Sequence, residues 1–501
     1  MRLTKAQTFM RFRICRTSVA QLLISTLLLS TSATQAAPLG LAKPLLANYI
    51  APYQDPNAGH ALTHTPTPLV TTKDTLQNKL RNVPQWLGKL DTARYVQLAT
   101  RHFDQYENGT DLNTLSTQLE HDFAQRLLAK YVEYKLLART GLWCDLQIQQ
   151  GNLATQAKAV RYLLWLTGDY ESSEGLIDDG IQLCQQRPQR ASSAEYRLSA
   201  TPFDNSQLNN SIKSFQQRHG IKASGNLDKK TIQLLSESPA SIAERIHLNL
   251  QRMQSINTPL QGRHIVANIP EFKLALREGT DTVLELKTIV GKRSRPTPEL
   301  TLQMTHVVLN PSWGVPRKLA KLDIIPKVIR DRDYLVRKQF SVYSRSGGNE
   351  TRIPAENIDW SAMQKNFPYY LRQAPGKNNA LGQFKFVTPN ARAIYLHDTN
   401  SRGLFRKNVR AFSSGCLRVQ NPGLLAQHVM HNTAYASPDH LRKKLQSGNT
   451  RSLRVADGLP VYIVYWTTWV DASGQLQQRD DIYEKDILPQ AKPMFARNDA
   501  R

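Results

Sequence analysis

The hydrophobic pattern of the chain changes from a helical period to a strand period near residue 262. Beyond this point, apolar and polar residues alternate in short stretches separated by Gly, Asn and Pro. Alternation with a period of two is typical of strands with one buried face. The stretches are HIVANIP, FKLALRE, TVLELKTIVG, THVVLNP, FKFVTPN, AIYLHDT and VYIVYWTTWV. They predict a mainly β domain over residues 262–470, followed by a C-terminal strand and tail over residues 471–501.

A long polar insert interrupts these strands at residues 316–376. It contains RKLAKLDIIPKVIRD, in which apolar residues recur at helical spacing. Long insertions in compact domains are usually lids or binding loops rather than filler. We therefore expect a partly helical insert that caps a cleft.

The half of the chain before the strands is predicted to be helical. In residues 76–195, FAQRLLAKYVEYKLL and VRYLLWLTG carry apolar residues three and four positions apart and offer no reactive cluster. We expect a helical scaffold domain there. Residues 37–75, rich in Pro, Thr and Ala, predict a flexible lead-in. Residues 200–258 predict a smaller helical module, whose first helix ends at Gly220. The predicted fold class is thus multidomain α+β.

The N-terminus has the composition of an export signal. Five basic residues precede the apolar run VAQLLISTLLLS and the small residues SATQAA. This pattern predicts a signal peptide over residues 1–36 with cleavage after Ala36. The apolar run is short for a transmembrane span, so the protein contacts a membrane only if the signal stays uncleaved.

The chain is strongly basic. Its formal net charge is +25, and roughly +20 remains once the five basic signal residues are removed. A charge of this size favours a polyanionic partner, such as an acidic wall polymer or anionic lipid. Export argues against nucleic acid. A basic surface that serves solubility alone remains the alternative.

Three cysteines remain after the signal: Cys144, Cys184 and Cys416. The first two lie in the helical half, where they either form a disulfide with each other or stay as two buried thiols. An odd number leaves one thiol over in an oxidising compartment. Cys416 is that thiol, and it lies among small and basic residues in RAFSSGCLRV.

Cys416 is a candidate nucleophile. A thiol attacks as the thiolate and needs a base, and His397 at a strand end 19 residues earlier is the candidate. The small residues Ser413, Ser414 and Gly415 would let the backbone approach a ligand closely, so that N–H groups near Gly415 and Cys416 stabilise an oxyanion. Nearby cations would lower the pKa of the thiol and attract an anionic substrate. They are Arg402, Arg406, Lys407, Arg410 and Arg418.

Zinc is the competing interpretation of this cluster, with His397, Cys416 and His428 as ligands. Their spacing fits no compact ligand pattern and no CxxC motif is present. We therefore expect neither a metal nor a cofactor.

The whole neighbourhood of Cys416 resembles the active site of the L,D-transpeptidases. HDTNSRGLFRKNVRAFSSGCLRV has that family's histidine, spacer and Ser-x-Gly-Cys followed by a basic position. Similar stretches are GRHIVANIP, IVGKRSRPTP, VVLNPSWGVP, APGKNNALGQFKF and WVDASGQLQQRDDIY. FQQRHGIKASGNLDKKT in turn resembles the three-helix peptidoglycan-binding module, with Lys229 or Lys230 in place of a family glycine. The order of parts is similar to that of the large periplasmic members of Gram-negative bacteria.

The resemblance implies an enzyme that acts on tetrapeptide stems of peptidoglycan and forms 3→3 cross-links with loss of D-alanine. Cys416 would form the thioacyl-enzyme, with His397 as acid and base. Ser414 and Gly415 would contribute the oxyanion pocket. Arg418 would bind the substrate carboxylate or form a structural salt bridge. Tyr395 would contact substrate or pack in the core, as would Trp313 and Trp360.

Other functions remain open beside this one. An L,D-carboxypeptidase or a hydrolase of the same fold would act on the same stems. A wall-binding protein with a vestigial site and a sortase-like acyltransferase are more distant alternatives; the latter lacks Ser-x-Gly before its cysteine. Donor and acceptor stems are the expected partners, together with other proteins of wall synthesis, in the periplasm.

Overall fold

The fold was analysed in a computed structural model. The structure describes residues 122–138, 143, 153–170, 206–256, 260, 262–346, 348–364 and 366–487. The predicted signal peptide, the lead-in, Cys144 and Cys184 lie outside these residues. The chain divides into two compact units, of which the second comprises residues 119–135 and 198–501.

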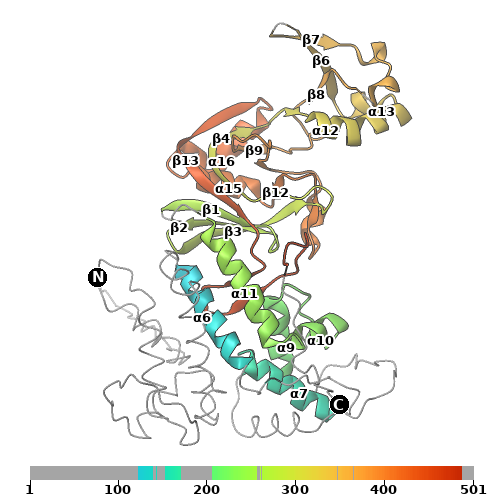
Figure 1. The fold of residues 1–501 in the computed structure, drawn as a ribbon. Coiled ribbons are helices and arrows are strands. Elements are labelled where there is room, and N and C mark those ends of the chain that lie inside the picture. The colour runs from blue at the N-terminus through green and yellow to red at the C-terminus, as the bar shows by residue number, and fades with distance from the viewer. Residues whose placement is uncertain are drawn as a thin grey trace, which may run out of the picture. The chain divides into compact units, whose positions relative to one another are not determined.

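Nine of the strands after residue 262 form one sheet that closes on itself (Figure 1). Its order is β11-β3-β12-β10-β9-β4-β13-β1-β2, and β2 also pairs with β3. The strands are β1 (Arg263–Asn268), β2 (Lys273–Glu278), β3 (Asp281–Gly291), β4 (Leu300–Leu309), β9 (Phe384–Val387), β10 (Leu396–His397), β11 (Ala411–Ser413), β12 (Leu417–Val419) and β13 (Arg451–Val464). The pairs β1–β13, β10–β12 and β11–β3 are parallel. A β-rich region is therefore confirmed.

Alternate residues of these strands fill one hydrophobic core. Leu276 of β2, Met304 of β4 and Phe386 of β9 are fully buried in it. Side chains of successive strand residues point to opposite faces, which explains the sequence alternation. Helices α15 (Pro422–Val429) and α16 (Pro438–Gln446) add Leu425 and Leu441 to the same core.

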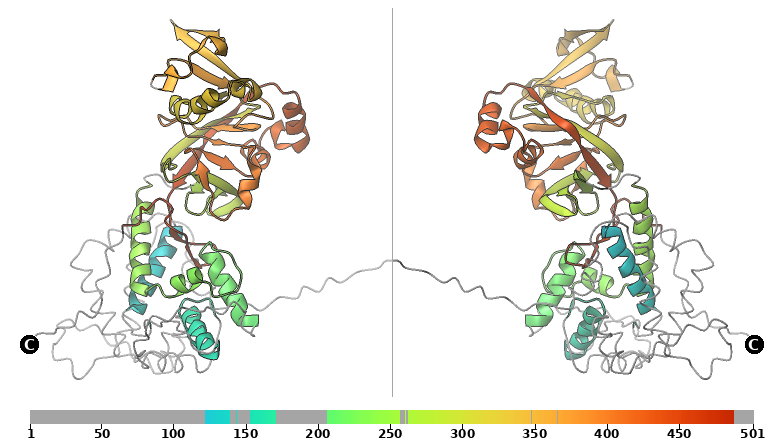
Figure 2. Two further views of the ribbon diagram at one scale, coloured as in Figure 1. Left: turned by 90° about the vertical axis from the view of Figure 1, so that its right-hand side faces the viewer. Right: turned by 90° about the vertical axis from the view of Figure 1, so that its left-hand side faces the viewer.

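The insert folds as a lobe with a core of its own (Figures 1 and 2). Its sheet has the order β5-β8-β6-β7, formed by β5 (Trp313–Gly314), β6 (Phe340–Ser346), β7 (Asn349–Ile353) and β8 (Tyr370–Gln373). Its helices are α12 (Arg317–Leu319), η2 (Ala320–Ile324), α13 (Ile325–Arg330) and α14 (Tyr334–Arg337). The prediction of helical parts missed this sheet, because the alternation of Phe340 and Val342 is short and lies among polar residues.

Three helices precede the sheet domain: α9 (Ser206–Arg218), α10 (Lys229–Leu235) and α11 (Pro239–Gln254). Asp228 and Ser238 cap the second and third through hydrogen bonds to backbone N–H groups. Leu208, Ile212 and Phe215 are buried on one face of α9, as their spacing predicts. The identification of these helices as a peptidoglycan-binding module stays a prediction.

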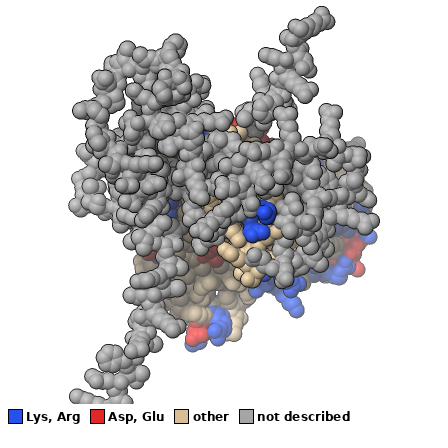
Figure 3. Space-filling view, turned by 90° about the horizontal axis from the view of Figure 1, so that it is seen from below, with Lys and Arg blue, Asp and Glu red and all other residues tan. Residues whose placement is uncertain are grey.

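Two helices of the predicted scaffold are described, α6 (Asp122–Leu137) and α7 (Leu153–Leu166). Among the helices of the described ranges, none has the length and apolarity required to cross a membrane. Where side chains are drawn in colour in Figure 3, basic patches are more extensive than acidic ones.

After β13 the chain forms a hairpin of β14 (Thr468–Val470) and β15 (Leu476–Gln478). Residues 479–487 follow as an irregular segment, which we call the C-terminal segment. This segment contacts both the helices and the sheet domain. Its Asp486 pairs with Arg252 of α11, and its Tyr483 hydroxyl donates to the carbonyl of Gly291 in β3.

Candidate active site

His397 and Cys416 lie on neighbouring parallel strands. In the register of β10 and β12, Leu396 pairs with Leu417 and His397 pairs with Arg418. The two leucines are buried in the main core. Because side chains alternate, His397 and Arg418 point to the opposite face. Tyr395 and Cys416 each lie two residues earlier in the chain, on that same face. The Leu417 N–H donates to the Tyr395 carbonyl at 3.2 Å and fixes this register.

Lys385 joins the same face from β9. It pairs with His397, while its neighbour Phe386 pairs with Leu396 in the core. The Lys385 ammonium lies 4.3 Å from the centre of the Tyr395 ring. Three adjacent strands thus present Lys385, His397 and Arg418 in one row beside the thiol.

His397 is held as a neutral base. Its Nδ1 donates to the Asp398 carbonyl at 2.5 Å, so the lone pair lies on Nε2. The side chain is 6% exposed. Burial, reinforced by the charges of Arg418 and Lys385, lowers the pKa of His397 to about 3. The imidazole therefore accepts a proton only in concert with a nearby negative charge, as a thiolate would supply.

Asp398 anchors this histidine. Its buried carboxylate accepts hydrogen bonds from the Gln383 and Thr399 N–H groups and pairs with Arg402 at 3.3 Å. A Cβ at Gly382 would lie 2.2 Å from the same carboxylate, so only glycine fits there. The aspartate thus fixes the backbone carbonyl to which the imidazole donates.

The Cys416 thiol lies between a carbonyl and the cations. Sγ donates to the Ala393 carbonyl at 3.7 Å. Burial raises the pKa of the thiol, although the Tyr395 backbone, Lys385 and Arg418 each act to lower it. The protonated thiol is consequently the resting form, and proton removal by a base is required for attack.

Of the five cations predicted to activate the thiol, Arg418 alone faces it. Arg410 turns inward and donates to the Thr288 and Phe272 carbonyls, and Arg402 pairs with Asp398. The sequence prediction grouped these residues by proximity along the chain. Lys385, 31 positions before Cys416, supplies the second cation instead.

Arg418 and Lys385 form no ion pair with any carboxylate of the described residues. Arg418 Nε is buried without a hydrogen-bond partner. A half-buried cation is costly unless it is paired. The row is therefore complementary to a ligand carboxylate, and a structural salt bridge at Arg418 is not formed within the described chain.

Tyr395 stands on the site face rather than in the core. Its ring meets that of His397 edge-on at 5.7 Å, and its hydroxyl interacts with Trp313. Burial raises the pKa of Tyr395, so the phenol stays neutral. Trp360, in contrast, is 1% exposed in the core of the insert, where its indole donates to the Ala355 carbonyl. Of the two roles left open for Trp360, the structure shows packing in a core.

The turn before Cys416 is closed by Ser413. Its hydroxyl donates to the Cys416 carbonyl at 2.6 Å and accepts from the Gly415 N–H at 3.1 Å. Gly415 has φ of +121°, in the region that favours glycine. Ser414 Oγ accepts from Arg295, whose guanidinium also binds Asp323 of the insert.

Sequence reasoning missed four residues that support the site: Lys385, Asp398, Arg295 and Thr297. Lys385 carried a signal, since a lysine between two phenylalanines in a strand must point to the opposite face. The others act through contacts between segments far apart in the chain and carried none. His428 lies on α15, and no group of three or more His, Cys, Asp and Glu suited to a metal ion occurs within the described ranges.

Residues 262–463 match the family model of the YkuD L,D-transpeptidase catalytic domain. Over 308 residues the chain is 34% identical to a candidate L,D-transpeptidase from Haemophilus influenzae. The aligned region covers 59% of this chain and 60% of that protein. The chain therefore spans about three fifths of the length of this curated relative.

Two solved L,D-transpeptidase structures are also similar, each at 12% identity. The one from Mycobacterium smegmatis has a TM-score of 0.19 over 40% of this chain and 58% of that chain. The one from Stackebrandtia nassauensis has a TM-score of 0.21 over 61% and 89%. We base no inference on likenesses at these scores.

Proposed function

We propose that this protein forms 3→3 cross-links in peptidoglycan through a thioacyl-enzyme on Cys416, because residues 262–463 match the model of the L,D-transpeptidase catalytic domain. The observation that carries the proposal is the placement of Cys416 and His397 on one face of the parallel pair β10–β12. The unpaired cations Lys385 and Arg418 on that face support an anionic donor stem.

In the first half-reaction His397 Nε2 takes the thiol proton as Sγ attacks the carbonyl carbon of the third stem residue, a diamino acid. The tetrahedral intermediate collapses when the bond to the D-alanine nitrogen breaks, and the imidazolium returns its proton to that leaving amine. The Cys416 backbone N–H is the candidate oxyanion donor. D-alanine leaves and the thioester remains.

In the second half-reaction the side-chain amine of an acceptor stem attacks the thioester. His397 takes a proton from that amine, and the thiolate leaves and is protonated again. Water in place of the amine would give a tripeptide, the product of an L,D-carboxypeptidase. The insert lies close enough to matter for this choice, since Asp323 reaches Arg295 beside Ser414. We propose that it closes over the donor and excludes water.

The proposal extends to location and partners. A predicted signal over residues 1–36 supports export to the periplasm, and the basic excess supports attachment to an anionic wall. The helices of residues 200–258 are a proposed wall-binding module. We propose other wall-synthesis proteins as partners, and no role for nucleic acid.

The test is intact mass spectrometry of the purified protein with a disaccharide-tetrapeptide, beside Cys416→Ala. We expect a thioacyl adduct and a dimer lacking one D-alanine with the wild type, and neither with the variant. Adduct followed only by tripeptide would establish a carboxypeptidase. Absence of any adduct on a folded wild type would contradict the proposal.

A further inference from the structure

Thr297 is the centre of a hydrogen-bond group beneath the turn from Ser413 to Cys416, which we call the nucleophile turn. The residue is fully buried. Its Oγ1 donates to the Gly415 carbonyl at 2.8 Å and accepts from the Gly291 N–H at 2.8 Å. Its own N–H donates to the Tyr483 hydroxyl at 3.1 Å, which in turn donates to the Gly291 carbonyl at 2.6 Å. Thr297 and Tyr483, which we call the Thr297–Tyr483 pair, thus satisfy one another and Gly291.

This pair determines how the peptide between Gly415 and Cys416 is oriented. The bond is trans and planar, so its carbonyl and its N–H point in opposite directions. A carbonyl fixed toward Thr297 therefore directs the Cys416 N–H away from Thr297. That N–H makes no hydrogen bond within the described part of the chain. The amide of a nucleophilic residue is a frequent oxyanion donor.

Tyr483 comes from outside the region that matches the family model, which ends at residue 463. Its ring stacks on Tyr465 at 5.4 Å, and its N–H donates to the Tyr465 hydroxyl at 2.8 Å. The Tyr465 hydroxyl donates to Asp481 at 2.5 Å. Tyr483 and Asp481 therefore both hold the C-terminal segment to Tyr465, which directly follows β13.

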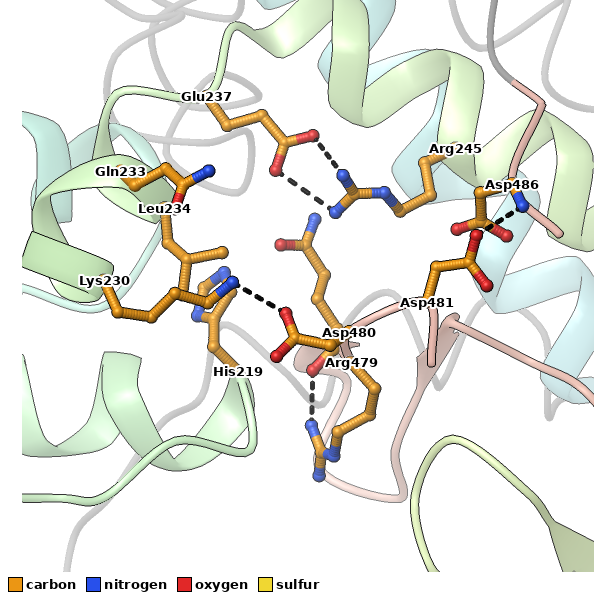
Figure 4. Close-up of a pocket in the computed structure, with 11 residues that line it drawn as sticks. His219, Lys230, Gln233, Leu234, Glu237, Arg245, Arg479, Asp480, Asp481 and Asp486 are labelled. Carbon is orange, nitrogen blue, oxygen red and sulfur yellow. Dashed lines mark hydrogen bonds and ion pairs between the residues drawn. The ribbon is translucent and has the colours of Figure 1, made fainter. Parts of the chain in front are cut away.

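The same segment is held to the three helices (Figure 4). Asp480 pairs with Lys230 of α10 at 2.8 Å. Asp486 pairs with Arg252 of α11 at 2.7 Å and accepts from Thr467. These contacts border a cavity of about 450 Å³ whose charged groups are largely paired with each other. We read this region as an anchor for the segment rather than as a second ligand site.

We propose that Thr297 and Tyr483 are positioning residues for the oxyanion donor, so that the C-terminal segment is part of the catalytic apparatus. The proposal rests on the proposed function, because it assumes that Cys416 is acylated. Loss of the Tyr483 hydroxyl would leave the Thr297 N–H and the Gly291 carbonyl unpaired in a buried place. The turn would then relax and the Cys416 N–H would lose its direction.

The test compares two reactions of the same thiol. Iodoacetamide alkylates Cys416 by displacement and forms no oxyanion, whereas 4-nitrophenyl acetate acylates it through a tetrahedral oxyanion. We expect Tyr483→Phe and Thr297→Val to slow acylation by about tenfold or more and to change alkylation by less than about twofold. Thr297→Ser keeps the hydroxyl and should restore most of the acylation rate. Tyr435→Phe, at the edge of the same core, is the matched control.

Equal slowing of both reactions in folded variants would assign Thr297 and Tyr483 a purely structural role and overturn the proposal. Unchanged acylation would overturn it as well. Nitrophenyl acetate also separates this inference from the proposed function. A wild type that is acylated by the ester but not by the disaccharide-tetrapeptide would refute the peptidoglycan substrate while leaving the Thr297–Tyr483 pair testable.

Discussion

Arg295 binds Asp323 through both terminal guanidinium nitrogens, with Nη1 2.5 Å from Oδ2 and Nη2 3.0 Å from Oδ1. The same Nη1 lies 3.0 Å from Ser414 Oγ, two residues before Cys416. Asp323 belongs to η2 of the insert, whereas Arg295 follows β3 of the sheet domain. The insert is therefore joined to the nucleophile turn by one side chain.

Asp323→Asn should weaken this connection and change the products. A partly exposed ion pair contributes up to about 1 kcal/mol, which corresponds to about a fivefold shift between closed and open positions of the insert. We expect the ratio of cross-linked dimer to tripeptide to fall by up to about fivefold, measured by chromatography of the products. Asp331→Asn is the control, since Asp331 pairs with Arg337 inside the insert. A ratio that falls equally in both variants would argue against a role for the connection.

His397 should keep the enzyme active in mild acid. Only the neutral imidazole can accept the thiol proton, and burial lowers the pKa of His397 to about 3. A lowered pKa moves the loss of base function to lower pH, so acylation by the tetrapeptide should not decline through pH 6.5. Single-turnover rates between pH 5 and 8 measure this, with circular dichroism to verify folding. An acid limb centred near the ordinary histidine value of about 6.5 would contradict it.

Replacing the imidazole gives the complementary result. His397→Gln should reduce the acylation rate by about 10²- to 10⁴-fold, the usual contribution of a general base. His306→Gln is the control, because His306 lies on β4 and bonds to its neighbour Thr305. Acylation within threefold of the wild type in His397→Gln would remove the base role from this residue.

The sheet was predictable because burial alternates along its strands, as in KLALRE of β2. β10 was predicted as part of AIYLHDT, whereas β12, with three residues, is too short to show a period and was not predicted. The insert was placed by its polarity, but its sheet was missed because the alternation in β6 lies among polar residues. Cys416 and His397 could be named as candidates from the sequence since a reactive thiol needs a base, and their roles stay predictions.

The supporting residues could not be found in this way. Thr297 and Tyr483 lie 186 positions apart and meet only because β3 and the C-terminal segment both reach the nucleophile turn. A threonine hydroxyl bonded to a backbone carbonyl leaves no pattern in composition or spacing. The same holds for Asp398, whose function depends on the fold around Gly382.

His219 should make the fold sensitive to acid. The imidazole is buried beside Phe215, and burial with the nearby charge of Arg218 lowers its pKa well below the ordinary value. The unfolded chain takes up a proton near pH 6.5 and the folded chain does not, so stability present above pH 6.5 is lost as the pH falls. This group therefore contributes to the loss of stability as the pH falls from 7.5 to 5.0.

His219→Gln should therefore flatten the decrease in thermal midpoint between pH 7.5 and 5.0, measured by circular dichroism. His431→Gln, at an exposed histidine, should leave the decrease unchanged. If His219→Gln retains the full decrease, His219 is not the source of acid sensitivity.

Lys385 should control the reactivity of the thiol from the neighbouring strand. Burial raises the pKa of Cys416, and the ammonium of Lys385 acts against that rise. Lys385→Met keeps the length of the side chain and removes the charge, so the pKa of the thiol should rise further. We expect the alkylation rate by iodoacetamide at pH 8 to fall several-fold and its pH profile to move to higher pH. Lys407→Met removes a charge from the exposed loop before Cys416 and should change neither.

The direction of that shift separates two roles for the lysine. Lys385 lies opposite His397, so a methionine there also removes a positive charge that lowers the pKa of the imidazole. If Lys385 acts by charge alone, the thiol and the imidazole should both titrate at higher pH in the variant. Added salt, which screens the charge, should shift the pH profile of the wild type by less than the substitution does. A profile that stays in place while the binding of the tetrapeptide weakens would instead make Lys385 a ligand for the substrate carboxylate.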